Sequence, residues 1–247
     1  MDSNVGLVIQ CVGIGLVTLL SFFMLRSIQG VSQKCWTVAW SCLSLSLSSL
    51  IVAFHVPALR DVFYPLYFFG EYAFGLMFVA GCSYQATGKS VSKNYLFAVL
   101  ASILVAALLP YLSDDFNTLF LVQASIMAAL LAAAFHVLRP ARRREPSSLG
   151  LRVLSVALLL LALDFLHYVP VFGARVGAWG ISVPEAYLKY TSIIDLILET
   201  MLAFGTVMVV MEGVRREVEA ANRELTAARD RLELLARVDP LTEALNR

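Results

Sequence analysis

The stretch VGLVIQCVGIGLVTLLSFFML, at Val5–Leu25, contains no charged residue. A helix needs about 20 consecutive, mostly apolar residues to cross the hydrocarbon core of a bilayer, and this stretch meets that length. Asp2 precedes it without any basic residue, whereas a cleavable signal peptide opens with a basic segment. The stretch therefore predicts a retained transmembrane helix.

Six further stretches have the same character. Hydrophobic residues make up 59% of the 247 residues and charged residues only 15%, against about a quarter in soluble domains. The predicted spans are Val5–Leu25, Trp36–Val56, Val62–Tyr84, Tyr95–Leu112, Asn117–Leu138, Leu151–Phe172 and Ala186–Met211. We therefore predict an all-α membrane protein, a seven-transmembrane helix bundle.

The orientation of this bundle is predicted from the charges between the spans. The first, third and fifth connections hold the basic residues Arg26, Lys34, Lys89, Lys93, Arg139, Arg142, Arg143 and Arg144. The alternate connections pair Arg60 with Asp61, Asp114 with Asp115, and Arg175 with Glu185. Because cytoplasmic loops carry the excess of Lys and Arg, the N-terminus is predicted outside and the C-terminus in the cytoplasm.

After Met211 the chain becomes charged and helix-forming, with no proline between Pro184 and Pro240. A helix from Glu185 to Val238 would be about 80 Å long. Apolar residues recur at alternating spacings of four and three, which is the heptad pattern of a coiled coil. An amphipathic helix lying on the bilayer surface is the alternative. The acidic as well as basic outer face favours the coil.

The heptad pattern predicts a parallel homodimer. With Val218 at position a, Glu224 falls at g and Arg229 at the following e, the pairing that a parallel two-stranded coil uses. The predicted interface residues are Val218, Leu225, Leu232 and Leu235. The seam also contains alanines, so we expect a weak coil, which suits a signalling linker.

The sequence ends with VDPLTEALNR at Val238–Arg247, where Asp before Pro ends one helix. These residues resemble the opening of a GGDEF domain, the catalytic domain of bacterial diguanylate cyclases. That family begins with a D-x-L-T turn and an Asn-Arg pair directly after a coiled-coil signalling helix. The matching residues are Asp239, Leu241, Thr242, Asn246 and Arg247. Glu243-Ala244 stands where the family more often has Gly-Leu.

The resemblance implies that the complete protein condenses two GTP molecules into cyclic di-GMP, with Mg²⁺ in the catalytic domain. The catalytic motif itself is not in this sequence, so we expect the chain to be the sensory and dimerising half and not the enzyme. The expected domains are a sensor at 1–212, a signalling helix at 213–238 and the first GGDEF residues at 239–247. The expected location is the bacterial cytoplasmic membrane. The expected partners are a second copy, lipid and a small ligand, with no nucleic acid.

Ionisable residues within the predicted spans mark a candidate ligand site. Each costs about 2.5–3.5 kcal/mol at the centre of a membrane helix, so such residues usually have a function. The candidate ligand-binding residues are Tyr67, Glu71, Asp164, His167, Asp195 and Glu199. We expect them to converge on one cavity in the outer half of the membrane. Alternatively, the acids form interhelical hydrogen bonds and the aromatic residues an interfacial belt.

Other classes of protein fit the sequence less well. A haem or metal at His55 or His167 is not expected, because a lone His at a helix end is more often interfacial. A transporter would have broken helices at the midplane, and no span has a central Gly-Pro pair. A retinal photoreceptor would need a more central lysine than Lys189. A histidine-kinase input module is the nearest alternative, but its coil would carry a phosphoacceptor His.

Overall fold

The computed structural model describes residues 5–28, 30–89, 94–113, 115–177 and 185–237. Over these residues the protein is helical throughout and contains no strand, which confirms the all-α prediction. The elements are α1 (Val5–Ser27), α2 (Val31–His55), η1 (Pro57–Leu59), α3 (Arg60–Thr87), α4 (Asn94–Leu108), η2 (Leu109–Tyr111), α5 (Phe116–Arg144), α6 (Leu149–Arg175) and α7 (Glu185–Arg237). The uninterrupted helix predicted from Glu185 is α7.

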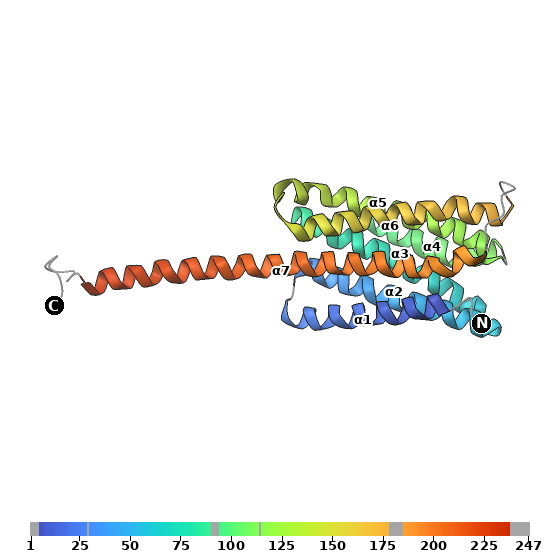
Figure 1. The fold of residues 1–247 in the computed structure, drawn as a ribbon, viewed down its shortest axis with the longest axis horizontal. Coiled ribbons are helices and arrows are strands. Elements are labelled where there is room, and N and C mark those ends of the chain that lie inside the picture. The colour runs from blue at the N-terminus through green and yellow to red at the C-terminus, as the bar shows by residue number, and fades with distance from the viewer. Residues whose placement is uncertain (1–4, 29, 90–93, 114, 178–184, 238–247) are drawn as a thin grey trace. The chain divides into compact units, whose positions relative to one another are not determined.

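The chain divides into two units, Met1–Val209 and Val210–Arg247. The first unit is a bundle whose helices run side by side (Figure 1). Among the described residues, six helices are long and apolar enough to cross a membrane, namely α1, α2, α3 with η1, α5, α6 and α7. The apolar helix α4, continued by η2, is shorter than these six.

Six helices of the first unit form a closed ring. Neighbours pack in the order α1, α2, α3, α5 and α6, while α4 packs against α3. Helix α7 closes the ring, because Gly13 of α1 lies against the Leu196 side chain and Gly205 of α7 lies against Leu154 of α6. The fourth helix in the sequence is therefore outside the ring, and the last helix lies beside the first.

Two glycines bring α6 and α7 into backbone contact. A Cβ atom added to Gly150 of α6 would lie 2.6 Å from the backbone nitrogen of Val209. A Cβ added to Gly205 of α7 would lie 2.7 Å from the Cα of Leu154. Small residues allow such close approach in membrane helix pairs, where van der Waals packing replaces the hydrophobic effect.

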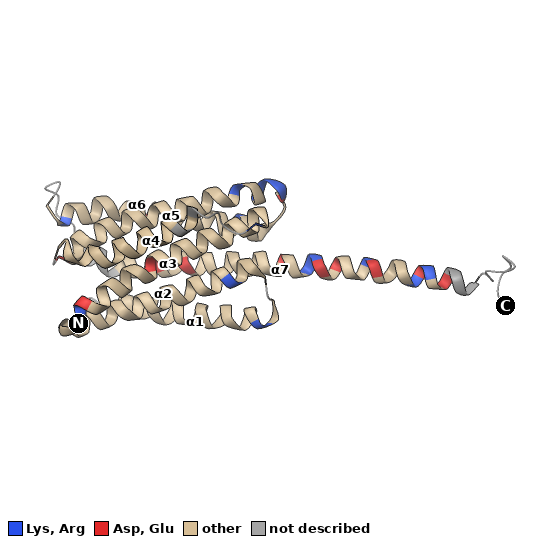
Figure 2. Ribbon diagram, turned by 180° about the vertical axis from the view of Figure 1, so that it is seen from behind, with Lys and Arg blue, Asp and Glu red and all other residues tan. Residues whose placement is uncertain are grey.

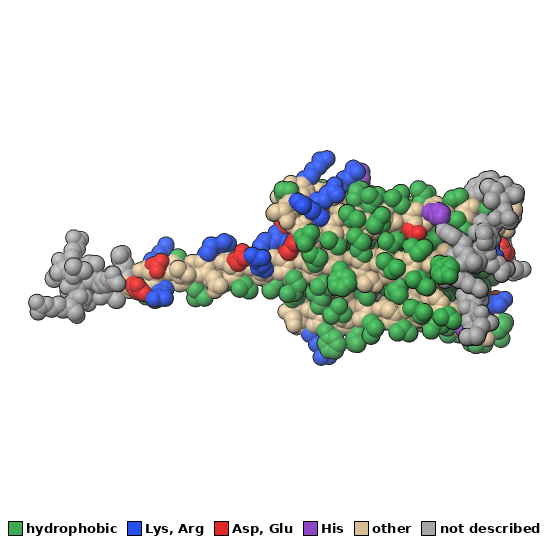
Figure 3. Space-filling view, viewed as in Figure 1, with side chains coloured by type: hydrophobic (Ala, Val, Ile, Leu, Met, Phe, Trp, Pro, Cys, Tyr) green, Lys and Arg blue, Asp and Glu red, His purple; other side chains and the backbone are tan. Residues whose placement is uncertain are grey.

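Charge is concentrated at one end of the first unit. Arg26 lies in the last turn of α1 and Arg142–Arg144 in the last turn of α5, at the same end of the bundle (Figure 2). The side of the bundle between its ends is covered by apolar side chains (Figure 3). Val12 and Leu16 of α1, for example, are 61% and 64% exposed. An outward apolar face of this kind is what a helix bundle needs in lipid.

Helix α5 begins with a polar cap. The Asp115 carboxyl accepts hydrogen bonds from the backbone nitrogens of Asn117 and Thr118, at 3.2 and 3.3 Å. Partial burial works to raise the pKa of this carboxyl, but hydrogen bonds from the same two residues lower it below its usual value. The cap satisfies backbone N–H groups that have no partner within the helix.

The second unit contains the C-terminal part of α7, which the structure describes to Arg237. Its outer surface carries the ion pairs Arg215–Glu219 and Arg229–Glu233, at 2.7 and 2.9 Å. The seam residues Val218, Leu225 and Leu232 are 55%, 67% and 67% exposed. The side chain of Leu235 and the motif residues from Asp239 onward lie outside the described part. The homodimer stays a prediction.

We expect Gly205→Ala to destabilise the bundle by about 1–3 kcal/mol, because the new methyl group meets the backbone of α6. Thermal unfolding of the detergent-purified chain measures this effect. Gly15→Ala is the matched control, since nothing lies within 4 Å of a Cβ at that position in α1. Alanine is the better helix former, so the control should unfold at an equal or higher temperature. Equal melting of both variants would contradict the close packing of α6 on α7.

Candidate functional site

A cavity of about 270 Å³ lies inside the ring. Every helix of the ring contributes to its wall. The lining residues are Leu7, Gln10, Leu47, Leu50, Phe54, Tyr67, Glu71, Phe116, Asn117, Phe120, Phe165, Tyr168, Phe172, Arg175, Thr191, Ser192, Asp195 and Glu199. They belong to the N-terminal halves of α1, α3, α5 and α7 and the C-terminal halves of α2 and α6, so the cavity lies toward the end opposite Arg26 and Arg142–Arg144.

Aromatic rings form much of the cavity wall. The Phe120 ring lies 4.5 Å from that of Phe172 and 5.8 Å from that of Tyr168, measured between centroids. Phe116 joins the same group, 6.2 Å from Tyr67 and 5.9 Å from Phe120. These rings come from α3, α5 and α6, so a ligand in the cavity would meet flat apolar surfaces on several sides.

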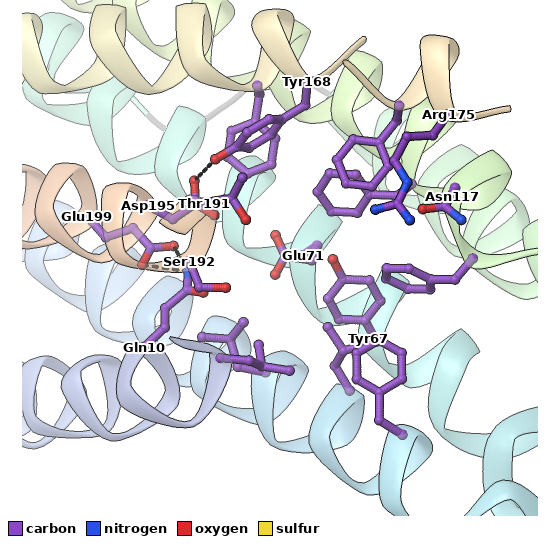
Figure 4. Close-up of a pocket in the computed structure, with 18 residues that line it drawn as sticks. Gln10, Tyr67, Glu71, Asn117, Tyr168, Arg175, Thr191, Ser192, Asp195 and Glu199 are labelled. Carbon is purple, nitrogen blue, oxygen red and sulfur yellow. Dashed lines mark hydrogen bonds between the residues drawn. The ribbon is translucent and has the colours of Figure 1, made fainter. Parts of the chain in front are cut away.

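The Glu71 carboxyl points into this cavity (Figure 4). Its side chain is only 4% exposed. The Ser46 hydroxyl of α2 lies 3.1 Å from one carboxyl oxygen and 2.9 Å from the backbone oxygen of Tyr67. A serine hydroxyl has one hydrogen and can donate to only one of these oxygens at a time. The second oxygen of Glu71 makes no hydrogen bond within the described part of the chain.

Two further carboxyl groups come from α7, one turn apart. The Tyr168 hydroxyl of α6 donates to Asp195 at 2.8 Å. The Gln10 amide of α1 donates to both oxygens of Glu199, at 3.1 and 3.0 Å. Gln10 and Glu199 are 5% and 4% exposed, so this contact is shielded from water. Helix α7 is therefore joined to both of its ring neighbours by polar contacts at the cavity.

The part of the cavity near the C-terminal end of α6, called the outer part below, is lined by a cationic side chain and an amide. Arg175, the last residue of α6, and Asn117, near the start of α5, both line it. In Figure 4 both lie on the side of the cavity away from Asp195 and Glu199, with Glu71 between the two sides. Asn117 also donates to the Asp115 cap at 2.8 Å, which restrains its side chain. The cavity thus has an acidic inner part and a cationic outer part.

The structure brings together four of the six predicted ligand residues, because Tyr67, Glu71, Asp195 and Glu199 all line the cavity. Asp164 does not line it. This residue lies near enough to Asp195 for an electrostatic interaction, and its Oδ2 is buried without a hydrogen-bond partner. His167 also lies off the cavity, with an exposed side chain whose ring centroid is 6.4 Å from that of Tyr168.

His55 does not line the cavity. The Nδ1 atom of His55 lies 2.8 Å from the backbone oxygen of Ile51 in its own helix, and its side chain is exposed. Within the part of the chain that the structure describes, no group of three or more His, Cys, Asp or Glu residues could hold a metal ion.

Sequence reasoning missed five polar residues of the cavity, namely Gln10, Asn117, Arg175, Thr191 and Ser192. Gln10 is the one amide side chain in the uncharged first span, which is a signal that could have been used. The sequence predicts Arg175 to lie in a loop, because it follows the last apolar turn of its span. Its proximity to the cavity depends on the extra helical turn that carries α6 to Arg175.

Comparison with known proteins finds no matching family model, no matching curated protein and no matching solved structure. The class of the protein is accordingly defined by its own fold and site. The described chain is an all-helical bundle of the multi-pass membrane type, with a cavity inside its ring of helices.

We expect Gln10→Leu to destabilise the bundle by about 1–3 kcal/mol, because it leaves Glu199 buried without its hydrogen-bond donor. Adding Glu199→Leu should recover most of that loss, since both polar groups are then removed together. Thermal unfolding of the two single variants and the double variant gives the coupling between the residues. Strictly additive effects would mean that the contact between α1 and α7 contributes nothing.

Proposed function

We propose that this chain is the sensory module of a membrane-bound diguanylate cyclase. In this proposal seven spans cross the bacterial cytoplasmic membrane with the N-terminus outside. The cavity receives a small ligand from the outer side, and two copies pair through the seam of α7. The output is cyclic di-GMP synthesis by the GGDEF domain, whose opening is proposed for residues 239–247.

One observation carries the sensory part of the proposal. Helix α7 contributes Asp195 and Glu199 to the cavity and also carries the heptad seam. A ligand that interacts differently with these carboxyl groups in two states of the bundle shifts the balance between those states. The same helix that meets the ligand is then the helix that pairs with its partner.

The proposal of a seventh span rests on the combined length of α4 and η2. Fifteen α-helical residues and three in a 3-10 helix rise about 28 Å together, close to the 30 Å of a hydrocarbon core. The orientation rests on the basic residues at the end of the bundle remote from the cavity. In that orientation the cavity belongs to the outer half of the membrane.

The dimer rests on the apolar seam. Val218, Leu225 and Leu232 are more than half exposed in the single chain. Large apolar side chains at heptad positions are stabilised when a second helix covers them. Because the seam contains Ala221 and Ala228, the stabilisation is small enough for pairing to respond to a signal.

We expect a membrane-impermeant maleimide to label Asp61→Cys, but not Arg143→Cys, in spheroplasts. Both substitutions are made in a chain whose four cysteines are replaced by alanine. Position 61 is at the cavity end and position 143 at the basic end of the bundle. After permeabilisation both should react, which controls for accessibility. External labelling at position 143 would reverse the orientation.

We expect one or two residues inserted after Val214 in the complete protein to change cyclase activity without changing membrane insertion. Each added residue rotates the following helix by about 100°, so the paired catalytic domains turn away from one another. Cyclic di-GMP measured in membranes that contain equal amounts of each variant tests this effect.

Insertion of a whole heptad at the same place is the matched control, and it should restore most of the activity because the seam realigns. Activity that is indifferent to helical phase would show that the helix is a passive tether. A complete protein that makes no cyclic di-GMP under any of these conditions would refute the proposed output.

A further inference from the structure

We propose that the cavity binds an organic zwitterion, with its ammonium group at Glu71 and Asp195 and its carboxylate at Arg175 and Asn117. This ligand class rests on the proposed sensory function and deepens it. The geometry points to it because the cavity has two chemically opposite parts joined by aromatic walls (Figure 4).

The inner part is built for an ammonium group. Glu71 is 96% buried, and one of its carboxyl oxygens faces the cavity with no hydrogen bond from the described chain. A buried carboxylate is costly unless it is paired and hydrogen-bonded. A primary ammonium group has three N–H donors, so it can serve Glu71 and Asp195 together. Glu199 already accepts two hydrogen bonds from Gln10 and needs no ligand.

The aromatic walls favour an organic cation over an inorganic one. Tyr67, Phe116 and Phe120 present rings beside the acidic part, with neighbouring centroids about 6 Å apart. A ring face attracts an ammonium group, and its apolar surface packs against methylene groups. An inorganic cation would find no oxygen ligand on the rings of Phe116 and Phe120.

The outer part is built for a carboxylate. The Arg175 guanidinium offers a planar fork of N–H donors that matches the two oxygens of a carboxylate. The Asn117 amide also lines the cavity and adds a further donor. A carboxylate deeper in the cavity would instead meet Glu71 and Asp195, which repel it. The positions of the acidic and basic side chains therefore determine the orientation of the bound ligand.

A ligand with only one of these charges would use one part of the cavity. A simple amine would meet the acids and the rings and leave Arg175 to water. A simple carboxylic acid would meet Arg175 and leave the second oxygen of Glu71 unpartnered. A zwitterion satisfies both parts at once, so its affinity should exceed that of either half.

Direct binding to the purified chain tests this ligand class without reference to cyclase output. The chain is reconstituted in nanodiscs and titrated calorimetrically with glycine, β-alanine, γ-aminobutyrate, δ-aminovalerate and ε-aminocaproate, which separate the two charges by increasing distances. The amine and the carboxylic acid of the same chain length as the best of these serve as probes that lack one charge. We expect one member of the series to bind at least about tenfold more tightly than both.

Variants then assign the two ends. Arg175→Gln should lower the affinity for the zwitterion by about tenfold or more and leave that of the amine unchanged. Glu71→Gln should weaken both the zwitterion and the amine. Arg60→Gln and Asp61→Asn are the matched controls, because they remove charges at the same end of the bundle from residues that do not line the cavity. Thermal unfolding identifies any variant that has lost its fold, and Arg175→Lys then replaces Arg175→Gln.

The possible outcomes distinguish a failure of the proposed ligand class from a failure of the proposed sensory function. No binding of any zwitterion at roughly 10 mM, or equal affinity for the amine, overturns the ligand class even if the helix-phase experiment succeeds. Tight binding that Arg175→Gln does not weaken also overturns it. Binding with the expected pattern, together with a cyclase that ignores the same ligand, upholds the ligand class and refutes the proposed sensory output.

Discussion

The hydrogen bonds from Gln10 to both oxygens of Glu199 join the first helix of the chain to the last. The closed ring depends on this contact, because α1 and α7 are its most distant neighbours in the sequence and no connecting segment holds them together. Gly13 lets the Leu196 side chain approach at the next turn, so the polar contact is sealed by apolar packing. Closing the ring is also what encloses the cavity, since each of its helices supplies part of the wall.

The helices themselves were predictable, because the length of an apolar run is set by the thickness of a bilayer. The predicted span Val5–Leu25 is α1 at Val5–Ser27, and the predicted Leu151–Phe172 is α6 at Leu149–Arg175. It was less predictable which side of each helix faces lipid and which side packs against other helices. In water an apolar stripe marks the buried side of a helix, whereas in lipid the outer side is apolar as well. The displacement of α4 from the ring and the exposure of His167 follow no periodicity in the sequence.

The candidate site was predictable to the extent that charge is costly within lipid. Glu71, Asp195 and Glu199 are predictable for that reason, and the structure places all three at one cavity. Gln10 and Arg175 give a weaker signal, since an amide is cheaper to bury and an arginine at a helix end is ordinary. Their roles arise only when α1 and α6 are set beside α7. Because the site is assembled from six helices, no single stretch of the sequence contains a motif that identifies it.

The backbone contact of α6 with α7 has a mechanical consequence. Gly205 holds α7 against Leu154, while Asp195 and Glu199 lie about 15 and 9 Å away along the helix axis. The backbone contact leaves α7 little room to move sideways at Gly205, so a sideways displacement at the carboxyl groups would tilt the helix more than it would translate it. The distance along α7 from Gly205 to the cavity then sets how large a tilt a given displacement produces.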